Sequence, residues 1–139
     1  MDVFVYGTLT EPDRVAEVLD SYVYVGPATL FGLHLVEGQY PTLAPGGETA
    51  GRLLRTEELE TLDEYEGVEA ELYRRVTVPL NAPDGHPEDA AVYVGDPDKL
   101  DADAAWPGDG AGRDDAELGF AERVDRYLER EDIRVRLTP

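Results

Sequence analysis

The chain has 139 residues, with 31 aspartates and glutamates against 12 lysines and arginines, a formal net charge of -19 and no cysteine. This length suits a single domain with a hydrophobic core, expected over residues 1–139, and the missing cysteines exclude disulfides, thiolate nucleophiles and thiolate metal ligands. Because so acidic a chain repels phosphate backbones and anionic lipid surfaces, we expect neither nucleic-acid nor membrane partners.

The acidic residues are spread over the whole chain, and lysine is almost absent, with Lys99 the single example. This pattern is typical of proteins adapted to high intracellular salt, where counterions screen the self-repulsion. The N-terminal residues lack a basic segment followed by a cleavable apolar run, and no stretch of about 18 apolar residues occurs. We therefore expect a cytoplasmic protein.

The first elements are a short strand and a helix. The apolar run Val3–Tyr6 predicts a buried strand that stops at Gly7. Thr10 is the expected N-cap of a following helix, with Pro12 in its first turn. The loop between the two, from Tyr6 to Leu9, has a glycine that lets the backbone approach a ligand.

Strands dominate the next part of the chain. Aromatic and β-branched residues predict two strands, Tyr22–Leu30 and Phe31–Val36, with a bend at Gly26. Prolines and glycines predict a loop over Gly38–Gly47, after which Gly51–Arg55 re-enters the sheet.

A second helix carries the most informative residue of the chain. Thr56 is its expected cap, and Gly67 suits the left-handed position just beyond its C-terminus. Leu59, Leu62 and Glu66 recur at helical spacing, so one carboxylate shares the apolar face. Burial and the negative end of the helix dipole both raise the pKa of such a group, which prepares it to act as a general base.

The C-terminal half predicts two more strands, Leu72–Leu80 and Ala90–Gly95, joined by a polar turn. A Gly-, Pro- and Asp-rich excursion over 96–114 follows, in which Trp106 is a candidate anchor, and an amphipathic helix is expected over 115–131. About six strands and three helices indicate a mixed α/β fold with a curled sheet or small barrel.

The inventory of reactive side chains is short. Ser21, the single serine, lacks the glycine-flanked turn of a hydrolase nucleophile, and His34 and His86 sit in contexts typical of core or surface histidines. No metal-binding motif occurs, so we expect no metal. Elimination leaves carboxylates and tyrosines for proton transfer, with Glu66 the best-placed carboxylate. Amides of the Tyr6–Leu9 loop are candidates to hold an anion or oxyanion.

Other interpretations of the same residues stay open at this point. Glu66 could instead pair with Arg74 or Arg75 at the end of its helix. Tyr6 and Tyr73 could be ordinary core aromatics with their hydroxyls at the rim. Alternation in the strand places Arg75 beside Tyr73, where an arginine either pairs with an acid or lines a wet cavity.

Taken together, four segments resemble the γ-glutamylcyclotransferase-like family, in particular its γ-glutamylamine cyclotransferase and AIG2-like branch. They are, in order, 3–9 (VFVYGTL), 38–41 (GQYP), 62–67 (LDEYEG) and 73–75 (YRR). The resemblance covers about residues 1 to 95 and implies a small mixed β-barrel with flanking helices. It implies a catalytic Glu66, a ligand-holding loop of Tyr6, Gly7, Thr8 and Leu9, and further pocket residues Tyr40, Pro41 and Tyr73.

The resemblance also implies a reaction that needs no metal or cofactor. The α-amine of a γ-glutamyl amide attacks its own γ-carbonyl, Glu66 transfers the protons, and 5-oxoproline leaves together with an amine or amino acid. The motifs do not identify that amine. The alternative is a non-catalytic domain that holds a small anionic metabolite in the same cavity. An inward carboxylate favours catalysis, because an anionic ligand would gain nothing from it.

Overall fold

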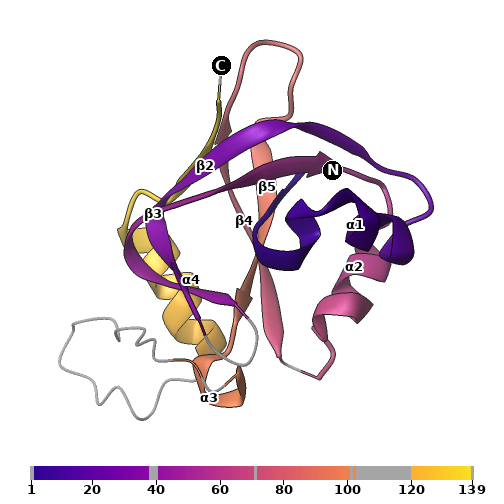
Figure 1. The fold of residues 1–139 in the computed structure, drawn as a ribbon. Coiled ribbons are helices and arrows are strands. Elements are labelled where there is room, and N and C mark those ends of the chain that lie inside the picture. The colour runs from indigo at the N-terminus through magenta and orange to yellow at the C-terminus, as the bar shows by residue number, and fades with distance from the viewer. Residues whose placement is uncertain (1, 38–40, 71, 101, 103–119, 139) are drawn as a thin grey trace, which may run out of the picture.

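A closed barrel of six strands forms the centre of the molecule (Figure 1). The computed structural model describes residues 2–37, 41–70, 72–100, 102 and 120–138. Around the barrel the strand order is β1-β3-β2-β6-β4-β5; the β1–β5 and β4–β6 pairs are parallel, and the other pairs are antiparallel. The mixed barrel predicted from the sequence is confirmed. The strands are β1 Asp2–Val5, β2 Val23–Val36, β3 Thr42–Arg55, β4 Tyr73–Asn81, β5 Asp89–Gly95 and β6 Arg134–Leu137.

Short helices surround the barrel, and α1 and α2 lie beside each other on one side of it (Figure 1). The part of the chain that the structure describes has no helix long and apolar enough to cross a bilayer. The helical elements are the 3-10 turn η1 Gly7–Thr10, α1 Pro12–Val18, α2 Leu59–Glu66, α3 Pro97–Leu100 and α4 Phe120–Arg130.

The number of strands agrees with the expectation, but two of the predicted segments are wrong. Tyr22–Leu30 and Phe31–Val36 are not separate strands, because β2 runs through both of them. Its pairing with β3 shifts register between Tyr24 and Gly26 and again between Phe31 and Leu33, so the strand bends without ending. The sixth strand is β6, which the sequence analysis missed.

The predicted loop Gly38–Gly47 is also wrong over its second half. β3 begins at Thr42, and its proline, Pro45, lies opposite Leu33 at the second register shift. Proline is accommodated at such irregularities because the regular hydrogen-bond ladder is already interrupted there. Residues 38–40 lie outside the described residues.

The ends of the helices differ from the predicted caps. Glu11 is the N-cap of α1 and makes no side-chain cap bond, while the Thr10 hydroxyl donates to the Gly7 carbonyl at 2.6 Å. Thr10 is drawn into the η1 turn and is not the cap. At α2 the N-cap is Glu58, whose N–H is accepted by the Thr56 hydroxyl at 3.1 Å.

The polar excursion expected over 96–114 begins with the short helix α3, whose Leu100 is buried. Most of that segment, including Trp106, and residues 115–119 of the expected C-terminal helix lie outside the described residues. The described part of that helix, α4, ends at Arg130.

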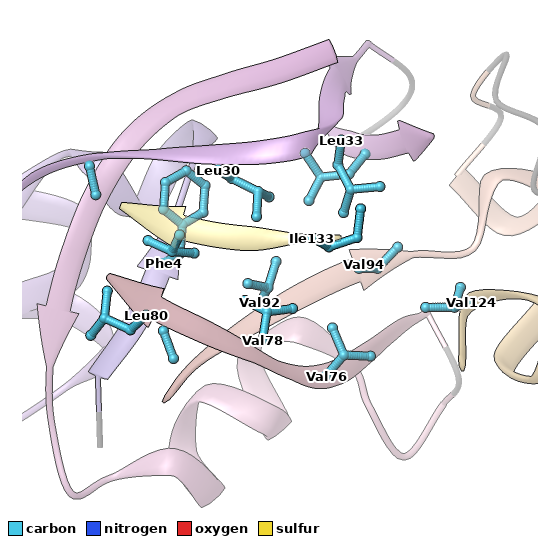
Figure 2. Close-up of a cluster of buried hydrophobic side chains, with 14 of the residues drawn as sticks. Phe4, Leu30, Leu33, Val76, Val78, Leu80, Val92, Val94, Val124 and Ile133 are labelled. Atoms are coloured by element: carbon cyan, nitrogen blue, oxygen red, sulfur yellow. The ribbon is translucent and has the colours of Figure 1, made fainter. Parts of the chain in front are cut away.

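Two hydrophobic layers hold the fold together. Figure 2 shows side chains of β2, β4 and β5 that project into a common interior, joined there by Phe4 of β1 and Val124 of α4. A second cluster lies between the barrel wall and α1 and α2; it contains Val3 and Val5 of β1 and Leu62 of α2. β1 therefore buries both faces, which explains its uninterrupted apolar run.

We predict that Gly51→Ala destabilises the protein by about 2–3 kcal/mol, because the added Cβ would overlap the Val5 carbonyl oxygen and lie 2.7 Å from Phe4 Cζ. Gly85→Ala is the control: nothing lies within 4 Å of its Cβ, so only the strain of a positive φ of 98° remains, about 1 kcal/mol. Urea unfolding of both variants measures the difference. Equal losses would show that β1 and β3 are not closely packed at Gly51.

Candidate active site

Glu66 is the last residue of α2, and the chain turns away immediately after it. Gly67 adopts the left-handed conformation (φ 70°, ψ 38°), and its N–H donates to the Glu64 carbonyl at 3.2 Å. The N–H of Val68 closes the cap on the Asp63 carbonyl at 3.0 Å. The left-handed glycine predicted at this position is therefore confirmed, and it fixes the place where the Glu66 side chain leaves the helix.

A cavity of about 390 Å³ opens beside this helix end. It brings together Glu66, the start of η1, Pro41 just before β3, and residues of β4 and β5. Neither histidine, nor Ser21, nor Lys99 lines it. The lining residues are Phe4, Val5, Tyr6, Gly7, Leu9, Arg14, Pro41, Tyr65, Glu66, Leu72, Tyr73 and Tyr93.

Six of the residues predicted for the site line this one cavity, although they come from five separate elements or connections of the chain. Thr8 lies between Gly7 and Leu9 in η1, and the structure does not describe its side chain. Tyr40, also predicted for the site, lies outside the described residues. The six are Tyr6, Gly7, Leu9, Pro41, Glu66 and Tyr73.

The Glu66 carboxylate is partly buried and makes no hydrogen bond or ion pair with any described residue. Burial raises its pKa from the ordinary value of 4.5 to about 7. The cause is desolvation, since moving the carboxylate away from water disfavours the charged form. At neutral pH the group is therefore divided between its acid and base forms.

The arginines that could have neutralised Glu66 have other partners. Arg74 donates to Asp125 of α4 at 2.7 and 3.0 Å, and Arg75 donates to Asp63 at 2.9 and 3.1 Å. The interpretation in which Glu66 pairs with either arginine is therefore wrong. Arg75 pairs with an acid and does not line the cavity.

Tyr6 and Tyr73 place their rings in the cavity wall and donate their hydroxyls to backbone carbonyls. The Tyr73 hydroxyl donates to the Pro41 carbonyl at 2.6 Å, and the Tyr6 hydroxyl donates to the Tyr93 carbonyl. Burial raises the pKa of Tyr6 well above its ordinary value, and the nearby Tyr73 and Glu66 raise it further. Glu66 is thus close enough to Tyr6 to influence the ionisation of its phenol.

Tyr93 connects the two sides of the cavity. Its backbone carbonyl accepts from Tyr6, and its own hydroxyl donates to Asp63 at 2.7 Å. Burial raises the pKa of Tyr93, and the bond to Asp63 raises it further, so the phenol stays a donor. Asp63 lies one helical turn before Glu66, so this bond, together with Arg75, holds α2 against the barrel.

Arg14, Tyr65, Leu72 and Tyr93 also line the cavity, although the sequence patterns did not predict them for the site. Tyr65 precedes Glu66, and Leu72 precedes Tyr73. Both could therefore have been predicted as sequence neighbours of predicted site residues. Arg14 and Tyr93 belong to elements whose placement depends on how the barrel closes, and no local pattern marked them.

The fold and the cavity define a small closed-barrel protein with a desolvated acid in a pocket at one side of the barrel. A family model described as "Gamma-glutamyl cyclotransferase, AIG2-like" matches residues 3–109. The chain belongs to this family, as the sequence motifs predicted.

Individual relatives agree with this assignment. AIG2-like protein A and AIG2-like protein C of Arabidopsis thaliana are each 40% identical over 85 residues; the match covers 55% of this chain and 50% and 48% of theirs. The chain thus spans about half the length of these curated relatives. A solved structure named "Gamma-glutamyl cyclotransferase" aligns with a TM-score of 0.57 at 21% identity, covering 69% of this chain and 66% of that one. The solution structure of another Arabidopsis thaliana protein aligns with a TM-score of 0.50 at 28% identity and covers 93% and 83%.

We predict that Glu66→Gln stabilises the protein increasingly as pH rises. Below about pH 4.5 both folded and unfolded Glu66 carry the proton, so the difference from wild type is small. Between pH 4.5 and 7 the unfolded chain ionises while the folded one holds its proton, so wild type loses stability until the folded pKa of about 7 is passed. The difference at pH 8 should reach 1 to at most about 3 kcal/mol.

Denaturant unfolding of both proteins at pH 4.5, 6 and 8 measures this trend. Glu64→Gln, on an exposed position of the same helix, controls for the loss of one negative charge. A difference that is constant with pH, or that matches the control, would contradict a desolvated Glu66.

Proposed function

We propose that the protein is a cyclotransferase that cleaves a γ-glutamyl amide by intramolecular attack of the α-amine. The observation that carries this proposal is Glu66: its carboxylate has a pKa of about 7, has no cationic partner among the described residues, and lines the cavity with Tyr6 and Gly7. Membership of the gamma-glutamyl cyclotransferase, AIG2-like family supports the reaction class.

In the proposed reaction the substrate supplies the nucleophile, and the protein transfers protons. Glu66 accepts a proton from the α-ammonium, and the freed amine nitrogen attacks the γ-carbonyl carbon to form a five-membered ring and a tetrahedral oxyanion. As the oxyanion collapses, the bond from this carbon to the departing nitrogen breaks, and protonated Glu66 gives its proton to this nitrogen. The ring nitrogen still carries one proton more than the lactam keeps, and it releases that proton to water. The products are 5-oxoproline and an amine or amino acid.

A pKa of about 7 suits Glu66 to both halves of this transfer. A carboxylate of ordinary pKa is too weak a base for an ammonium group and too poor a donor once protonated, whereas a base near the working pH serves in both directions. The nucleophile belongs to the substrate, so proximity supplies much of the rate enhancement and the proposal needs no covalent intermediate or cofactor.

The start of η1 is the proposed binding site for the negative charge of the substrate or of the oxyanion. Gly7, at φ 69°, and Leu9 line the cavity, and the first N–H groups of a helical turn have no acceptor within that turn. Tyr6 and Tyr73 close the wall beside them with their hydroxyls fixed on backbone carbonyls. A small-molecule γ-glutamyl compound is the proposed partner.

We predict that purified protein releases 5-oxoproline from at least one member of a panel of γ-glutamyl amides and amino acids. kcat/KM should rise with pH through about 7, because the base form of Glu66 accepts the proton. Glu66→Gln should lower kcat at least about 100-fold, as expected for loss of a general base. Chromatographic assay of 5-oxoproline at high salt measures both effects.

Glu64→Gln is the matched control on the same helix and should retain activity. If wild type binds a γ-glutamyl compound by calorimetry and releases no 5-oxoproline from any panel member, the protein is a metabolite-binding domain. If Glu66→Gln turns over at the wild-type rate, the proposed role of Glu66 is wrong.

We further predict that Tyr93→Phe lowers kcat about tenfold while KM changes less than about threefold. The substitution removes the 2.7 Å bond to Asp63 and leaves the backbone carbonyl that accepts from Tyr6. Only the α2 side of the cavity is loosened, so Glu66 loses its alignment. Tyr127→Phe on α4 removes another phenol that donates to a backbone carbonyl, at 3.3 Å, outside the cavity. A loss of equal size in that control would mean that general stability, not alignment, is being measured.

A further inference from the structure

The cavity has an inner wall and a mouth, which the exposure of its lining residues distinguishes. Phe4, Val5 and Leu9 are almost fully buried and form part of the inner wall. Arg14 and Tyr65 line the same cavity, yet the Arg14 side chain is 47% exposed and Tyr65 is 40% exposed. These two side chains, from α1 and α2, therefore mark the opening to solvent.

The charged side chains that line the cavity differ in sign. Among the described lining residues, the ionisable side chains other than the tyrosines are Glu66 and Arg14, and the structure records no ion pair between them. Arg14 has one ion pair within the described residues, to Glu17 at 3.5 Å, with both side chains largely exposed. Pairs of this kind contribute little, so Arg14 can exchange Glu17 for a ligand at small cost.

We propose that Arg14 binds a carboxylate on the departing group of the substrate, so that the protein prefers γ-glutamyl amino acids or peptides to γ-glutamyl amines without an acid. This inference rests on the proposed function, because it assumes that the γ-glutamyl head lies at Glu66.

The chemistry of the head determines which end of the substrate meets Arg14. The α-carboxylate is bonded to the same carbon as the reacting amine, so it stays near Glu66 and the inner wall when the ring closes. The departing nitrogen belongs to the amine or amino acid that is released. Because this leaving group must exit to solvent, it faces the mouth of the cavity. An amino acid released there presents its own carboxylate beside Arg14.

Arginine suits this role for two reasons. Its planar guanidinium can donate two parallel hydrogen bonds to one carboxylate, which gives direction as well as charge. The chain also carries a net charge of -19, so an anionic substrate is repelled at long range. A cation at the opening offsets that repulsion where the substrate enters. The ring of Tyr65 supplies apolar surface at the same opening.

The test compares two substrates that share the γ-glutamyl head: γ-glutamyl-L-alanine, whose departing group has a carboxylate, and γ-glutamyl-ethylamide, whose departing group has none. For Arg14→Gln, we expect kcat/KM to fall about 10- to 50-fold further for the first substrate than for the second, and Arg14→Lys should recover part of that difference. Arg134→Gln removes one positive charge from β6, outside the cavity, and should not change the ratio.

Each outcome separates this inference from the proposed function. Equal losses on both substrates would place Arg14 on the α-carboxylate of the head and overturn the inference while cyclotransferase activity stands. An unchanged ratio with unchanged rates would also overturn it.

If wild type turns over neither compound, the proposed function fails in its catalytic step, and calorimetric binding decides the inference. Tighter binding of γ-glutamyl-L-alanine than of the ethylamide in wild type, lost in Arg14→Gln, supports it. Equal binding of the two, or binding of neither, overturns it.

Discussion

The desolvation of one carboxylate without a compensating cation is the constraint on which the proposed site depends. Burial raises the pKa of Glu66 to about 7, and Arg74 and Arg75, which could have neutralised the carboxylate, pair with Asp125 and Asp63 instead. The chain has few cations to distribute, 12 against 31 acids, and a cation within ion-pair distance of Glu66 would return its pKa toward the ordinary value. The pairing of the arginines is therefore part of how the acid is tuned.

The barrel holds the cavity residues in place because two of its strands, β1 and β5, are packed on both faces. β1 and β5 contribute to the interior core with one face and to the layer under α1 and α2 with the other. Tyr93 of β5 uses this position to bind both sides of the cavity, through its carbonyl to Tyr6 and through its hydroxyl to α2. A shift of either side changes the packing of both layers, so the cavity has little freedom to deform.

Sequence patterns anticipated the features that depend on local spacing and missed those that depend on closure of the barrel. Helical spacing selected Glu66, which lines the cavity, and the glycine after it marked the cap, because both signals lie within one short segment. β6 has four residues, in which two arginines alternate with Val135 and Leu137 and Val135 is fully buried, and it pairs with β4 residues more than fifty positions earlier in the chain. No local signal distinguishes such a strand from a polar tail. Arg14 and Tyr93 likewise line one cavity only because the fold brings distant parts of the chain together.

The position of Glu66 lowers the stability of the fold, and the proposed chemistry explains why a carboxylate is kept there. Leu59, Leu62 and Glu66 share one face of α2, and Leu62 is fully buried in the outer layer. A leucine at position 66 would extend this apolar face, fill part of the cavity and remove a charge that the folded protein desolvates at neutral pH. A chain under selection for stability alone has no reason to keep a carboxylate there without a cation. The proposed proton transfer by that carboxylate provides the reason, since groups that destabilise a fold gather where their reactivity is needed.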